Sequence, residues 1–133
     1  MSKTSDLAAK YSQLTDALAD LYNNLITAGQ NAAAVTVQEA NDKVAQAVED
    51  LAGLDAIDQL TDAHDQQVLA DLTNTMNAKN DAISAQEARV AAVVGIVNSL
   101  VNVVTNFAGG NVAAAVAAAS SAAKGLKQLP GGG

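Results

Sequence analysis

The residues of this sequence that could do chemistry are four aspartates around its single histidine. Asp58, Asp62 and Asp65 are spaced i, i+4 and i+7, so a helix through them would carry all three carboxylates on one face, and Asp55 precedes them. Several carboxylate oxygens together are the ligands that hard divalent cations prefer. Aspartate is also favourable in the first turn of a helix, where the macrodipole is positive. We therefore predict a solvated acidic face and no metal, with Asp58, Asp62 and Asp65 as the weak candidate ligands.

His64 follows Leu60 by four residues and precedes Val68 by four, which places it among the apolar positions of the same helix. We interpret it as a histidine of the helix seam rather than a catalyst. The sequence has no cysteine, and it has no nucleophile elbow, glycine-rich phosphate loop or HExxH motif. It therefore predicts a protein that is not an enzyme and that needs no cofactor.

The helix that would carry these aspartates can begin after Asp55 and run without interruption to Ala108. No glycine or proline lies between Gly53 and Gly95, so we expect one helix of about 53 residues and roughly 80 Å. The alternative is a break in the asparagine-rich residues 77–81, with a restart at a second capping box in residues 84–87.

Two helices are expected before it. The first has a heptad seam closed by Gly29, typical of a bundle helix or of a dimer zipper. The second begins at the capping-box pair Thr36 and Glu39, with Asn31 as a competing start, and ends at Gly53. The seam residues of the first helix, which we predict to form an interface, are Leu7, Tyr11, Leu14, Leu18, Leu21 and Leu25.

Residues 90–123 carry no charge and are predicted to form a helical hairpin. Gly109 and Gly110 end its first arm, and Asn111 can cap the second. The apolar stripe of the hairpin, also predicted as an interface, contains Val93, Ile96, Val97, Leu100, Val103, Val104, Phe107, Val112 and Val116. The opposite side of the first arm has asparagine every fourth residue, at Asn98, Asn102 and Asn106.

Charge also divides the chain into an acidic part, residues 1–89, and a part with few charges, residues 90–133. Residues 1–89 hold all 14 acidic residues and five of the seven basic ones, a net charge of −9, whereas residues 90–133 have a net charge of +2. Nucleic acid is excluded as a partner because phosphate binding needs a basic face. We predict an all-α protein, an elongated bundle of about four helices. Its acidic amphipathic region is 1–89, its uncharged hairpin 90–129 and its flexible tail 130–133, within one structural domain.

Two functions fit these features. In the first, the protein is structural: its alanine- and valine-rich helices pack against other copies of the chain, giving a homo-oligomer or polymer. In the second, the hairpin inserts into membrane lipid, as in a pore-forming or toxin-like component, since its first arm would span about 28 Å. We favour self-association. The N-terminus lacks the apolar core of a secretory signal, which leaves the cytoplasm or export by a signal-less route.

Overall fold

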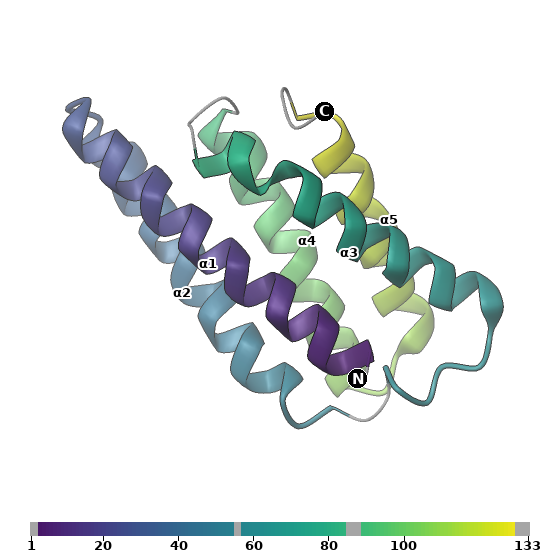
Figure 1. The fold of residues 1–133 in the computed structure, drawn as a ribbon. Coiled ribbons are helices and arrows are strands. Elements are labelled where there is room, and N and C mark those ends of the chain that lie inside the picture. Colours follow the sequence, from purple (N-terminus) through teal and green to yellow (C-terminus); the bar gives the residue numbers. More distant parts are fainter. Residues whose placement is uncertain (1–2, 55–56, 85–88, 130–133) are drawn as a thin grey trace.

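The computed structural model describes residues 3–54, 57–84 and 89–129, and every regular element in these ranges is an α-helix. The predicted all-α class is confirmed, whereas the predicted number of about four helices is one short. The helices, shown in Figure 1, are α1 (Lys3–Thr27), α2 (Asn31–Leu51), α3 (Ala63–Ser84), α4 (Val90–Ala108) and α5 (Val112–Lys127).

The five helices form a bundle in which each helix packs on two others, so that together they form a closed ring. α1 packs on α2 and α3, α4 packs on α2 and α5, and α3 packs on α5. In Figure 1 the α1–α2 hairpin lies on the left, with its tip projecting at the upper left, and α5 lies on the right. One hydrophobic cluster at the centre has members from all five helices. The helices of the acidic region, α1 to α3, therefore share one core with the uncharged hairpin, α4 and α5.

The prediction of one long helix is wrong at two places, before Ala63 and after Ser84. α3 begins at Ala63 rather than after Asp55, which itself lies outside the described residues, and α3 ends at Ser84. Arg89, immediately before α4, has the extended dihedrals φ −68° and ψ 139°. The asparagine-rich residues 77–81 are helical, so the alternative break is also misplaced. The capping box proposed for residues 84–87 falls mainly on residues outside the described ranges.

Packing explains why α3 ends without a glycine or proline. The amide Nδ2 of Asn24 on α1 donates to the Ser84 carbonyl at 2.8 Å, which satisfies an acceptor that the end of the helix leaves free. The Ser84 hydroxyl donates to Asp20 Oδ2 at 3.0 Å. Folding back at this point lets α3 and α4 bury their apolar stripes on other helices, which stabilises them more than continued helix propensity would.

The start of α2 also differs from the favoured prediction. α2 begins at Asn31, the competing start, with Gln30 at the N-cap position. Thr36 lies inside the helix, and its hydroxyl donates to the carbonyl of Ala32 at 3.2 Å instead of capping. The apolar positions of α2 follow the helical period from its first turn, and Ala34 and Val37 are both buried. Burial of these residues therefore favours a helix that begins before the capping box.

Glycine closes both hairpins in the same geometry. Gly29 and Gly110 each have φ of +78°, the left-handed conformation that glycine adopts at little cost. Gln30 N–H donates to the Leu25 carbonyl and Asn111 N–H donates to the Asn106 carbonyl, both at 2.8 Å. These bonds satisfy the last carbonyls of α1 and α4, so each chain reversal is fixed by local chemistry.

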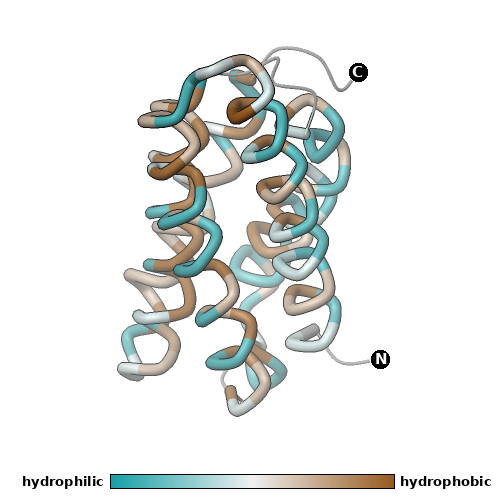
Figure 2. The backbone as a smooth tube through the Cα atoms, turned by 90° about the vertical axis from the view of Figure 1, so that its left-hand side faces the viewer, coloured by the Kyte–Doolittle hydropathy of each residue, from teal (hydrophilic) through white to brown (hydrophobic). Residues whose placement is uncertain are grey.

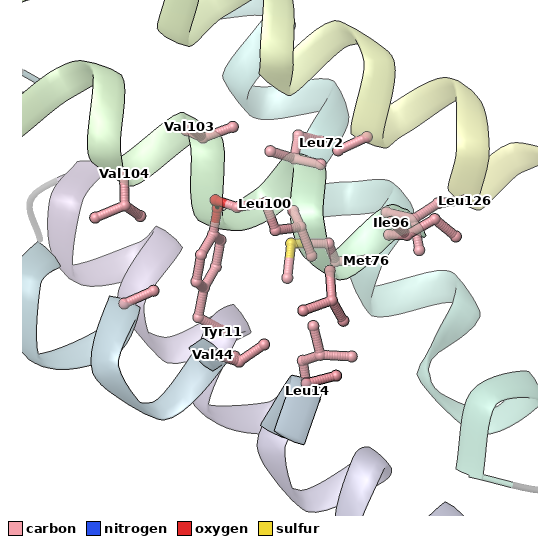
Figure 3. Packing of buried hydrophobic residues seen from close by; sticks show 14 of the residues in the cluster. Tyr11, Leu14, Val44, Leu72, Met76, Ile96, Leu100, Val103, Val104 and Leu126 are labelled. Carbon is pink, nitrogen blue, oxygen red and sulfur yellow. Dashed lines mark hydrogen bonds between the residues drawn. The ribbon is translucent and has the colours of Figure 1, made fainter. Parts of the chain in front are cut away.

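The core is filled by large aliphatic side chains that meet at the centre of the ring. Figure 3 shows Tyr11 of α1 directed towards α4, with Leu100 and Met76 beside it. Figure 2 shows brown hydrophobic and teal hydrophilic residues within the same helices, as expected of amphipathic helices. The residues with the largest fully buried side chains are Leu7, Tyr11, Leu18, Leu21, Leu25, Leu51, Ile57, Leu72, Met76, Ile83, Leu100 and Leu126.

Candidate functional site

The most distinctive surface of the bundle is the outward side of α4 and α5, which carries only small or uncharged polar side chains. On an ordinary soluble helix this side would hold Lys, Glu and Arg, yet here Asn98 and Asn102 are exposed in the middle of α4. We call this surface the charge-free face. Its exposed residues are Ala91, Ala92, Gly95, Asn98, Asn102 and Thr105 of α4 and Ala113, Ala117 and Ser121 of α5.

The two helices of this face meet in a shallow groove lined by small residues, including Gly95, Ser99 and Ser121. Gly125 lets them approach closely, because a Cβ built on it would lie 3.0 Å from Cγ1 of Ile96. Since one groove joins α4 to α5, the charge-free face is continuous across both helices. Its small side chains would let the backbone of another helix come close.

Charged residues border the face at its ends. Arg89, just before α4, and Lys124, in the last turn of α5, are exposed at the end of the hairpin opposite the glycine turn. Lys127 points towards α3, where its Nζ is 2.8 Å from Asp71 Oδ2, a pair exposed to solvent and so of small stabilising effect. Nearer the turn, Asp50 of α2 lines a second groove with Thr105.

The residues predicted as an interface lie inside the chain's own core. Side chains of this set have relative exposures of 8% or less, except Val112, which is partly buried against the same cluster. The stripes that suggested contact between chains therefore contact other helices of the same chain. This set comprises Leu7, Tyr11, Leu14, Leu18, Leu21, Leu25, Val93, Ile96, Val97, Leu100, Val103, Val104, Phe107, Val112 and Val116.

Tyr11 joins α1 to α4 across the centre of the bundle. Its hydroxyl donates to the backbone carbonyl of Leu100 at 2.6 Å, and the whole side chain is buried. Desolvation of the phenolate by burial raises the pKa of Tyr11 well above its usual value. Such a group keeps its proton through the physiological range, so it acts as a structural donor.

The aspartates singled out by their spacing serve the starts of two different helices. Asp62 Oδ1 accepts from the backbone N–H of His64 at 2.8 Å and of Asp65 at 3.1 Å, which makes it the N-cap of α3. Asp58 Oδ1 accepts from the backbone N–H of Thr4 at 3.1 Å, at the start of α1. Because residues 57–62 are not helical, the predicted shared helical face does not exist.

Two further consequences follow for the chemistry of this segment. His64 is exposed, so the prediction that it occupies the helix seam is wrong; Leu69 and Leu72 are the buried positions near the start of α3. Within residues 3–54, 57–84 and 89–129, no group of three or more His, Asp or Glu side chains is arranged to hold a metal ion. The carboxylates of Asp58 and Asp62 stabilise helix termini instead.

A small cleft between the start of α1 and α3 was not predicted from the sequence. Its walls are apolar, from Leu7, Ile57 and Leu69, and Asp6 and Asn74 line it as well. These residues are far apart in sequence and come together only when α3 packs on α1. The cleft, with a volume of about 260 Å³, is too small for more than a small amphipathic molecule.

Another feature that the sequence did not single out is the tip of the α1–α2 hairpin. Ile26 and Val35 are the large hydrophobic residues most exposed in the described part of the chain, at 43% and 54%. Two such side chains form a patch well below the size that marks an interface by itself.

One described helix, α4, is long and apolar enough to cross a membrane by length and composition. Its apolar stripe, however, is turned into the core: Val97, Leu100 and Val104 are buried. The residues that would meet lipid from the folded bundle are those of the charge-free face, including two asparagines. Insertion would therefore require the hairpin to leave the bundle.

No protein-family model, curated protein or solved structure matches this chain.

Proposed function

We propose that the protein is a structural, non-enzymatic component that associates with further copies of itself through the charge-free face. The observation that carries this proposal is the absence of charge from the outward side of α4 and α5, in a chain with a formal net charge of −7. Any other approach between two copies would bring acidic helices together. Contact through the charge-free face removes small side chains from water without desolvating a charge.

This proposal moves the interface from the buried stripes to the opposite side of the same helices. Alanine, glycine and serine permit close helix packing, and exposed amides such as Asn98 and Asn102 can form hydrogen bonds across the contact. Within the described residues, these two amide side chains have no partner in their own chain. Leu100 is unsuitable for a test of association, because a charge there would disrupt the core of the single chain.

The experiment is light scattering after size exclusion over a range of concentrations in detergent-free buffer. We expect the wild type to form an oligomer and the variant Asn102→Glu with Ala117→Glu to be a folded monomer. A matched control, Gln13→Glu with Gln38→Glu, adds the same charge at exposed positions of α1 and α2. It should associate like the wild type. A wild type that remains monomeric at every concentration contradicts the proposal.

Membrane insertion of the α4–α5 hairpin is the second candidate function, and the length and composition of α4 favour it. Dye release from vesicles distinguishes the two candidates. We expect no release, since burying the asparagines of α4 in hydrocarbon and opening the core both cost free energy. Release by the wild type that Asn102→Glu with Ala117→Glu abolishes would favour insertion instead.

A further inference from the structure

We propose that the second copy docks on the charge-free face in an antiparallel orientation, related by a two-fold axis that crosses the helices, so that α4 packs against α4 of the partner. This inference rests on the proposed function and adds the arrangement of the partner. Two flat faces of this kind can also meet about an axis along the helices, in which case α4 would pack on α5 of the partner with both copies in the same direction.

The charges at the ends of the face distinguish these arrangements. Because α4 and α5 form a hairpin, Arg89 and Lys124 lie at the same end, and both are exposed. The parallel arrangement would bring the basic ends of both copies together, so four cations would meet. The antiparallel arrangement separates them by roughly the length of α4, about 28 Å, which is several Debye lengths at physiological ionic strength.

Antiparallel packing also places each basic end near an acidic group. Asp50 lines the groove that contains Thr105, towards the glycine-turn end of α4. Lys43 lines the same groove, but it precedes Asp50 by seven residues and so lies about 10 Å nearer the middle of the face. The arrangement that brings Arg89 of one copy to Asp50 of the other, and that separates the two basic ends, therefore combines attraction with relief of repulsion.

The middle of the face suits a two-fold axis. Asn98 is midway between Ala91 and Thr105 along α4, so antiparallel packing brings it opposite Asn98 of the partner. An amide has both donors and an acceptor, so two related asparagines can bond reciprocally. Two helices about 10 Å wide and about 28 Å long give a total buried area near 1,100 Å², the lower end for a specific interface.

Disulfide cross-linking tests the orientation directly, because the sequence contains no cysteine. Antiparallel packing predicts that Asn98→Cys links with itself, and that Ala91→Cys links with Thr105→Cys when the two variants are mixed. Parallel packing predicts instead that Asn102→Cys links with Ala117→Cys. Linking of this last pair, without the first two products, overturns the inference but leaves self-association intact. The absence of all three products, together with a monomeric wild type, refutes both.

Charge reversal provides an independent test. Arg89→Glu with Lys124→Glu makes both ends of the face acidic, and Asp50→Lys with Thr105→Lys makes both ends basic. We expect each variant alone to associate at least about tenfold more weakly than the wild type, and an equimolar mixture to recover by a similar factor. In the parallel arrangement Arg89→Glu with Lys124→Glu only replaces four cations by four anions, so association of this variant equal to that of the wild type would contradict antiparallel docking. Circular dichroism of each variant checks that these exposed substitutions leave the fold unchanged.

Discussion

The α1–α2 and α4–α5 hairpins have similar inner sides and different outer sides. Each has a glycine at φ +78° in its turn and a helical stripe of buried residues that enters the same cluster. The outer side of α1 and α2 carries acids such as Asp16 and Glu39, whereas the outer side of α4 and α5 is the charge-free face. The inner stripes therefore account for folding of one chain, and the outer sides decide how that chain meets others.

The largest effect that tests this comparison is a charge placed on either inner stripe. Leu18 of α1 and Leu100 of α4 are both fully buried. We expect Leu18→Asp and Leu100→Asp each to lower the free energy of unfolding by at least about 3 kcal/mol, since the change leaves a cavity and an unpaired buried carboxylate. Urea unfolding followed by circular dichroism measures it, with Leu100→Met as a volume-conserving control. A Leu100→Asp chain as stable as the wild type would show that this stripe of α4 is not in the core.

A smaller effect is expected where the two hairpins are joined by the Tyr11 hydroxyl and the Leu100 carbonyl. Tyr11→Phe removes this hydrogen bond and should cost about 1 kcal/mol at neutral pH. The same change at the partly buried Tyr22 provides the control and should cost less. If both substitutions lower the thermal stability equally, the hydrogen bond between Tyr11 and Leu100 does not stabilise the contact between the two hairpins.

The same tyrosine gives a pH dependence. Its pKa is raised in the folded chain, so above about pH 10 the unfolded chain releases a proton that the folded chain retains. The contribution is fully present below the ordinary pKa and declines as pH rises above it, by up to about 1.4 kcal/mol per pH unit. Tyr11→Phe should remove this part of the alkaline loss, and Tyr22→Phe should not. An identical alkaline decline in Tyr11→Phe and the wild type would contradict burial of Tyr11.

The smallest expected effect concerns the two turns. Gly29→Ala and Gly110→Ala each force an L-residue to a φ of +78° and should each cost about 1 kcal/mol, although neither added Cβ meets another atom within 4 Å. Gly95→Ala, in an exposed helix interior with similar free space, should instead stabilise the chain slightly. Thermal unfolding of the three variants sharpens the comparison: unequal costs at the two turns would show that they are not equivalent.

Most of the helical architecture and the uncharged character of residues 90–123 could be predicted from the sequence, but not which side of this hairpin would remain exposed. The heptad seam of α1, the stripe of α4 and the glycines after both helices are local signals, and the helices follow them. No glycine or proline marks the break between α3 and α4, and at the end of α3 Ser84 bonds with Asn24 and Asp20 of α1, which are distant in sequence. The aspartate spacing indicated one helical face, whereas Asp62 and Asp58 cap different helices, one of them distant in sequence.

The sequence by itself determined that the chain is helical, that glycine closes both hairpins, and that all acidic residues lie within residues 1–89. These are properties of residue type and of spacing within one turn. Only the tertiary structure decided what each apolar stripe is buried against. A period of 3.6 residues shows that a stripe is covered, but not whether a neighbouring helix or another chain covers it. Here the ring of five helices covers the stripes within one chain. The outward side of α4 and α5 is consequently left as the exposed, uncharged surface.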